Sequence, residues 1–134
     1  MQKKRKKEST SWEGVSSWYD KAVGKKGHYY HQKIVLPKAL EMLELGPKSK
    51  GALLDLACGQ GIISRHLPKA LSYQGIDIAP SLIKSAKEQN ERKDCSFLVS
   101  DITKPLPIEK KDFDYCSILL AVQNLEHPLK ALKN

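Results

Sequence analysis

One segment, LLDLACGQG at residues 53–61, restricts the fold of this chain more than any other. Its leucines favour a buried strand, and Ala57, Gly59 and Gly61 favour a sharp turn before a second apolar run at residues 62–67. The pattern therefore predicts a strand, a tight turn and a helix. Because glycine has no Cβ, a ligand can lie close to such a turn, and the free N–H groups of the helix would point at it. An ordinary strand-to-helix connection is the alternative.

Strands and helices alternate after this segment. Strands are predicted at residues 52–56, 72–78, 96–100 and 115–120, and helices are predicted from residues 62, 79 and 128. The fourth strand is almost continuously apolar, which is typical of a strand buried on both faces. Between the third and fourth strands, the segment TKPLPIEKKD reads as a surface loop. This alternation predicts an α/β fold with an open parallel sheet and right-handed crossovers.

The N-terminal third contains a different pattern. Leu36, Ala39, Leu40 and Leu43 have the spacing of one apolar helix face, and Gly46-Pro47 ends that helix. Pro37 should kink the helix or start a new one. With a short helix expected at residues 16–23, the pattern predicts a helical cap at residues 9–47, ahead of a domain at residues 48–134.

The charge of the chain is concentrated at its start. Lys and Arg number 23 against 15 Asp and Glu, but residues 3–7 supply five of the basic side chains, which leaves 18 against 15. A tail at residues 1–8 has no apolar residue after Met1 to bury, so we expect it to be disordered and solvated. Contact with nucleic acid through this tail alone is the alternative.

Other features exclude several classes of protein. No apolar stretch approaches the ~18 residues of a membrane span, and no apolar core of a signal peptide follows the basic run, so we expect a cytoplasmic protein. Cys58, Cys95 and Cys116 are expected to be reduced, buried thiols. His28 and His31 have a spacing that suits a metal, but no second ligand pair accompanies them, so no metal site is predicted.

Acidic residues follow successive predicted strands. Asp55, Asp77 and Asp101 stand at the ends of the first three, and Gln123-Asn124 follow the fourth. Ligands of such sheets bind outside the carboxyl ends of the strands. Asp77 lies 22 positions after Asp55, the distance at which a carboxylate on the second strand can bind both hydroxyls of a ribose. The pattern predicts a nucleoside ligand. Pyrophosphate would be poorly bound, because Ser64 replaces the third glycine of a dinucleotide motif.

These motifs resemble those of the class I S-adenosylmethionine-dependent methyltransferases of small molecules. The similar segments run from Ser16 to the end of the chain: SSWYD, GHYYHQ, DLACGQG with Ala57 in place of the usual glycine, GIDIAP, SDIT and DFDYCSILLAVQNLEHP. The resemblance implies a Rossmann-like sheet, S-adenosylmethionine as the cofactor and methyl transfer to a small-molecule acceptor.

The resemblance also implies the cofactor-binding residues. Besides Asp55 and Ala57, Gly59 and Gly61 would approach the methionine and adenosine parts, and Asp77 would bind the ribose. Ile78 and Ile102 would enclose the adenine, Asp101 would bind its exocyclic amine, and Tyr19, Tyr30 or His31 would close the site. No catalytic base is predicted, although His31 and His127 carry groups that could accept a proton.

The chain departs from this family at its C-terminal end. The family's sheet has seven strands, whereas this sequence ends just after the fourth, so we expect only the N-terminal half of the fold. The fourth strand would then be an apolar edge through which copies of the chain self-associate. Two other functions stay open: a non-catalytic nucleoside- or NAD-binding module, and a basic-tailed protein associated with nucleic acid.

Overall fold

The computed structural model describes residue 21 and residues 31–134. Along these residues, helices and strands alternate in the order that the sequence predicts. The elements are the π-helix η1 (His31–Val35), α2 (Leu36–Met42), β1 (Gly51–Leu56), the 3₁₀ helix η2 (Ile62–His66), β2 (Leu71–Asp77), α3 (Pro80–Gln89), β3 (Cys95–Val99), β4 (Tyr115–Ile118), the 3₁₀ helix η3 (Val122–Asn124) and α4 (Pro128–Leu132). The predicted basic tail and the helix at residues 16–23 lie outside the described residues, apart from residue 21.

The four strands form one parallel sheet in the order β3-β2-β1-β4. The central strand β1 is paired with β2 along its whole length and with β4 from Leu53 to Leu56. From β1 the chain adds β2 and β3 on one side, and β4 then pairs with β1 on the other side, so the strand order reverses beside β1. In open α/β sheets, such a reversal marks the ligand-binding edge.

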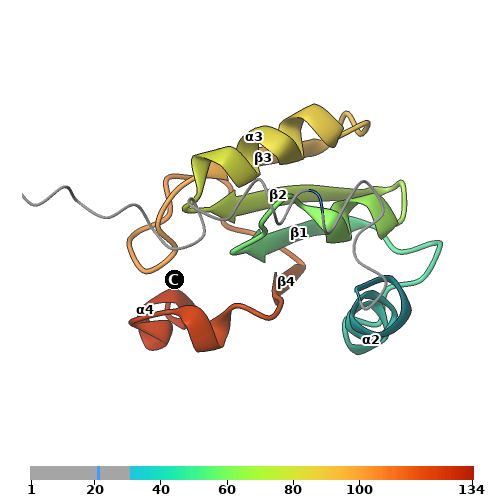
Figure 1. Ribbon diagram of the computed structural model, residues 1–134. Coiled ribbons are helices and arrows are strands. Elements are labelled where there is room, and N and C mark those ends of the chain that lie inside the picture. Colours follow the sequence, from blue (N-terminus) through green and yellow to red (C-terminus); the bar gives the residue numbers. More distant parts are fainter. Residues whose placement is uncertain (1–20, 22–30) are drawn as a thin grey trace, which may run out of the picture.

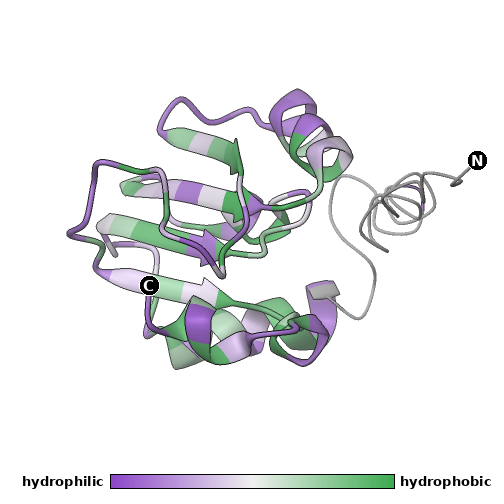
Figure 2. Ribbon diagram, turned by 90° about the vertical axis from the view of Figure 1, so that its left-hand side faces the viewer, coloured by the Kyte–Doolittle hydropathy of each residue, from purple (hydrophilic) through white to green (hydrophobic). Residues whose placement is uncertain are grey.

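The strands β1 and β2 lie side by side (Figure 1), and their side chains alternate between two apolar layers. Leu53 and Tyr73 pack on one face with residues of α2, η2 and α3, whereas Leu54 and Ile76 pack on the other face with Ile102 and with Ala131 of α4. The fully buried positions Leu53 and Ile76 have no exposed surface. Figure 2 shows the hydrophobic colour over parts of the strands, interrupted by paler and hydrophilic segments, and the hydrophilic colour along much of the connecting chain. Both faces of the sheet are therefore covered, as parallel sheets require.

Each α-helix within residues 31–134 begins with a proline in its first turn: Pro37 in α2, Pro80 in α3 and Pro128 in α4. Proline is favoured there because the missing N–H would have no partner within the helix. Pro37 thus starts a new α-helix after the π-helix η1, one of the two outcomes that the sequence allowed. The predicted buried stripe of α3, Leu82, Ile83 and Ala86, is confirmed.

Several predicted boundaries are wrong by one residue, and the segment after the glycine turn is a 3₁₀ helix of five residues. The larger error concerns β4. It ends at Ile118 instead of residue 120, and it is not buried on both faces, since Cys116 is exposed and Tyr115 and Ile118 are only half-buried. In the described sheet β4 is an edge strand with β1 as its neighbour, so it has less cover than its apolar sequence suggests. The prediction of a buried thiol at Cys116 is wrong for the same reason.

None of the helices in the described part of the chain is both long enough and apolar enough to cross a lipid bilayer.

Candidate functional site

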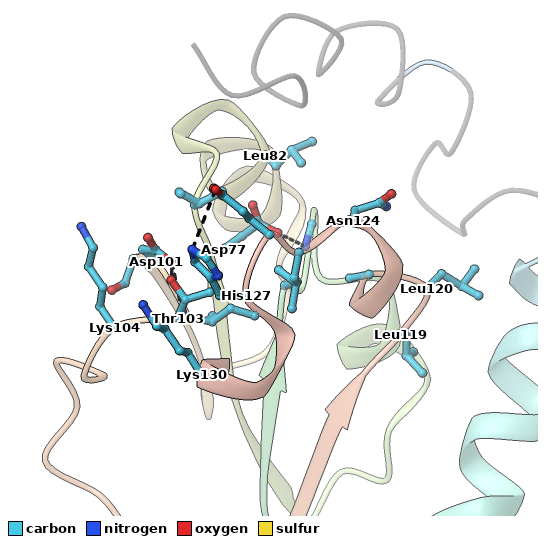
Figure 3. Close-up of a pocket in the computed structure, with 18 residues that line it drawn as sticks. Asp77, Leu82, Asp101, Thr103, Lys104, Leu119, Leu120, Asn124, His127 and Lys130 are labelled. Carbon is cyan, nitrogen blue, oxygen red and sulfur yellow. Dashed lines mark hydrogen bonds and ion pairs between the residues drawn. The ribbon is translucent and has the colours of Figure 1, made fainter. Parts of the chain in front are cut away.

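A cavity of about 620 Å³ lies at the C-terminal ends of the four strands (Figure 3). Residues that follow each strand line it, together with residues of α3 and α4: Ala57, Gly59, Asp77, Ile78, Leu82, Ser100, Asp101, Ile102, Thr103, Lys104, Leu119, Leu120, Ala121, Asn124, Leu125, Glu126, His127 and Lys130. Its volume is typical of pockets that hold small molecules and cofactors. A second cavity of about 70 Å³ shares Ala57, Gly59 and Leu119 with the first.

The turn between β1 and η2 forms one wall of the cavity. Its residues Ala57, Gly59 and Gly61 have positive φ angles of 54°, 57° and 71°. A Cβ on Gly61 would overlap the ring of Phe97, so glycine is required there by the packing of the core. Gly59 lines both cavities, whereas Gly61 lines neither. The turn thus brings the backbone at Gly59 to the cavity and keeps Gly61 behind it.

Asp77, the last residue of β2, holds this turn in place. Its Oδ2 accepts a hydrogen bond from the Gly59 N–H at 2.9 Å, and its Oδ1 accepts one from the Ala79 N–H at 2.9 Å. The residue is 8% exposed and lines the cavity. Because the carboxylate is fixed by two backbone donors, it is a preorganised acceptor for hydroxyl groups of a ligand.

Asp55 lies below the turn and is 3% exposed. Its Oδ2 accepts a hydrogen bond from the Tyr73 hydroxyl at 2.6 Å, and its Oδ1 accepts one from the Ser117 hydroxyl at 2.8 Å. The pKa of Asp55 is raised to about 6: burial raises it most, the hydrogen bonds from the Tyr73 and Ser117 hydroxyls lower it, and the negative charge of Asp77 raises it. Asp55 lines the smaller cavity and not the larger one. Through its two hydrogen bonds it joins β1 to β2 and to β4 beneath the site.

The turn after β3 forms another wall of the cavity. The Asp101 carboxylate accepts hydrogen bonds from the Thr103 hydroxyl at 2.6 Å and from the Thr103 N–H at 2.9 Å. These bonds lower the pKa of Asp101, and the charges of Lys104 and Lys130 lower it further. Ile102 beside it is 5% exposed.

The structure thus brings six of the predicted cofactor residues to one cavity: Ala57, Gly59, Asp77, Ile78, Asp101 and Ile102. Gly61 and Asp55 stand behind this cavity instead of lining it. Tyr19 and Tyr30 lie outside the described residues, and the side chain of His31 is not described. His127 lines the cavity, beside Glu126 and close to Lys130.

Sequence reasoning missed several lining residues, chiefly Leu119, Leu120, Lys104 and Lys130. Thr103 carried a signal, because an Asp two residues before a Thr commonly forms the local turn seen here. The sequence carries no signal for Leu120, because the position of this residue depends on a φ of 54° that the sequence does not predict. Among residues 21 and 31–134, no group of three or more His, Cys, Asp and Glu side chains could hold a metal ion.

Comparisons with known proteins agree with this geometry. A family model described as "Methyltransferase domain" matches residues 54–134. A demethylmenaquinone methyltransferase of Chlamydia pneumoniae is 31% identical over 86 residues, which cover 61% of this chain and 36% of that protein. A ribosomal protein L11 methyltransferase of Burkholderia lata is 32% identical over 95 residues, which cover 69% of this chain and 29% of that protein.

Among solved structures, a SAM-dependent methyltransferase from Aquifex aeolicus superposes with a TM-score of 0.70 and 21% identity. The match covers 88% of this chain and 63% of that one. The chain spans only about a third of the length of the two relatives above. Because the family model matches more than half of its residues, the chain belongs to the methyltransferase domain family, with the fold of the class I S-adenosylmethionine-dependent enzymes.

Proposed function

We propose that this chain is the cofactor-binding part of an S-adenosylmethionine-dependent methyltransferase. The observation that carries the proposal is Asp77, a nearly buried carboxylate at the end of β2, held by two backbone N–H groups and lining a cavity of about 620 Å³. Its fixed oxygens suit the paired hydroxyls of a ribose, the group at which a nucleoside is recognised in folds of this type.

The other residues of the cavity fit the remaining parts of such a cofactor. Ile78, which is 42% exposed, and Ile102 offer apolar surface to a flat purine ring, and Asp101 offers a carboxylate to its amine. Gly59 leaves room for the chain beyond the ribose, because it has no side chain. When bound, S-adenosylmethionine supplies a methyl group on a sulfonium sulfur that is already a good leaving group. The residues of the chain then act mainly by positioning the reactants, which can contribute ~7–11 kcal/mol.

We propose a small molecule as the methyl acceptor. The apolar end of the cavity, formed by Leu119, Leu120 and Ala121, supports this proposal because it offers a contact surface for an apolar substrate. The Chlamydia relative is named for demethylmenaquinone, whereas the Burkholderia relative is named for a ribosomal protein. A panel that includes both kinds of acceptor decides between them. A cytoplasmic location stays a prediction, supported by the free thiols at positions 58, 95 and 116.

Calorimetry with S-adenosylmethionine, S-adenosylhomocysteine and NAD tests the cofactor. The first two ligands should bind and NAD should not. Asp77→Asn should weaken S-adenosylmethionine binding at least about tenfold, because a charged acceptor for two hydroxyls is lost. Asp112→Asn is the matched control, since the Asp112 side chain is 90% exposed and pairs with Lys110 away from the lining residues. Binding of NAD alone would instead indicate the non-catalytic NAD-binding module.

A further inference from the structure

Two segments that line the larger cavity belong to opposite sides of the sheet. One is the turn at residues 100–104, which follows β3, and the other is the chain at residues 119–130, which follows β4. In the described sheet β3 and β4 are the two outer strands, so no strand pairing joins these segments directly. Other contacts must therefore set how the two segments lie relative to each other, and with them the shape of the cavity.

The side chain of Asn134 joins the two segments. Its Nδ2 donates hydrogen bonds to the backbone carbonyls of Ile102 at 2.8 Å and of Lys104 at 2.6 Å, and both of these residues line the cavity. The backbone N–H of Asn134 donates to the Ala131 carbonyl at 3.3 Å, which ties Asn134 to the end of α4. One side-chain amide thus uses both of its N–H bonds to hold the turn after β3 against α4.

An apolar contact supports the same junction. Ala131 of α4 is 2% exposed and belongs to the same buried cluster as Ile102. Figure 3 shows Asp101 on the turn and Lys130 on α4 among the side chains that line the cavity. The contacts of Asn134 therefore lie directly beside the part of the cavity to which the base of the cofactor is assigned.

The turn after β3 also has hydrogen bonds of its own. The Thr103 hydroxyl and N–H both donate to Oδ1 of Asp101, and the Ser100 N–H donates to the Asp77 carbonyl at 2.9 Å. These bonds fix the shape of the turn and its attachment to β2. Neither of the Thr103 bonds uses Oδ2 of Asp101, so that oxygen can accept from the amine of a base. Loss of the Asn134 bonds should move the turn relative to α4 without unfolding it.

We propose that Asn134 is a positioning residue for recognition of the cofactor's base. By holding the turn after β3 against α4, it sets the place of the Asp101 carboxylate relative to the base. The inference rests on the function proposed above and adds a residue that acts through the backbone of two lining residues. Because a hydrogen bond weakens steeply with poor distance or angle, a small displacement of the turn should lower the selectivity for adenine.

Calorimetry on the full chain tests this with S-adenosylhomocysteine and S-inosylhomocysteine, in which a carbonyl oxygen replaces the amine of the base. The unmodified chain should bind the first at least about tenfold more tightly, because the carbonyl has no proton to donate to Asp101. Asn134→Leu, which has no donors, should reduce this preference to about threefold or less. The ratio of the two affinities is the readout, since a smaller folded fraction weakens both equally. Asn134→Asp keeps the shape, also has no donors, and should have the same effect if the leucine variant does not fold.

Asn90 provides the matched control. It follows α3, and its Nδ2 donates to the backbone carbonyl of Arg92 at 2.8 Å, but this acceptor residue, unlike Ile102 and Lys104, lines neither cavity. Asn90→Leu should lower the unfolding temperature and keep the preference for S-adenosylhomocysteine. The proposal is overturned if the Asn134 variants keep the full preference, if Asn90→Leu reduces it equally, or if the unmodified chain binds both ligands alike. If the unmodified chain binds neither ligand, the proposed function itself fails.

Discussion

Ala57 occupies the one position of the glycine turn where a side chain is held against its conformational preference. Its φ is 54°, in the left-handed region that costs an L-residue roughly 1–2 kcal/mol and costs glycine almost nothing. The same residue lines both cavities. Strain of this kind is found where the surrounding structure fixes a turn for function.

Ala57→Gly should therefore stabilise the chain. The relief of backbone strain exceeds the extra entropy that glycine loses on folding, which is about 0.5–1 kcal/mol, so we expect a gain of up to about 1 kcal/mol and a rise of a few degrees in Tm. Thermal unfolding checks this. Ala79→Gly is the matched control, because Ala79 is buried with an ordinary φ of −89°, and it should lower the Tm. A fall in Tm for both variants would contradict the argument.

At the scale of elements, Arg92 joins η2 to the start of β2. Its side chain is 18% exposed, and all five of its N–H groups reach oxygen atoms. The acceptors are the Asp94 carboxylate at 3.3 Å and the backbone carbonyls of Ser64, Leu67, Pro68 and Leu71. No pattern in the sequence predicts this role, because the four contacts with backbone carbonyls join residues more than twenty positions apart.

Arg92→Lys should destabilise the fold by about 2–4 kcal/mol, since a lysine has three donors without the planar fork and leaves carbonyls unpaired. Urea unfolding measures the change. Lys84→Ala on α3 is the comparison: its side chain is 78% exposed and pairs with Glu88 at 3.9 Å, so its loss should change stability by no more than about 0.5 kcal/mol. Equal effects of the two substitutions would show that the arginine contacts contribute little.

The sequence predicted the helices and strands better than it predicted their burial and their neighbours in the fold. Periodicity and proline positions located the helices and strands of the described chain, because these signals are local. The half-exposed state of β4 depends on which strands neighbour it, and the burial of Asp55 depends on Ser117, which is 62 residues away. The same limit applies to the site: the glycine turn and Asp77 were visible as motifs, whereas the place of Leu120 in the cavity lining depends on the three-dimensional structure.

At the scale of the whole molecule, exposed apolar side chains lie near the edge of the sheet, after β4 and on α4. Leu120, Leu129 and Leu132 are 52%, 67% and 59% exposed. Self-association through this edge stays a prediction from the sequence. The centre of the sheet is different, since Asp55 on β1 is bonded to Tyr73 on β2 and to Ser117 on β4.

This central carboxyl group should make the stability of the whole fold depend on pH. The pKa of Asp55 is raised to about 6, first by burial, so the folded chain keeps its proton to a higher pH than the unfolded chain, whose group titrates near 3.8. Protonation therefore favours the folded state. The stabilisation is complete below about pH 4 and is lost as the pH rises through 6, and a difference of about two units corresponds to roughly 3 kcal/mol.

Asp55→Asn removes this titration and keeps a side chain of similar shape that can bond to both hydroxyls. Denaturant unfolding from pH 4 to pH 7 should show the stability of the unmodified chain falling relative to the variant by up to roughly 3 kcal/mol. Asp101→Asn is the control, because the pKa of Asp101 is lowered and its contribution changes only below about pH 4. Its stability should run parallel to that of the unmodified chain over this range. Parallel curves for Asp55→Asn as well would mean that Asp55 is not the group that links protonation to folding.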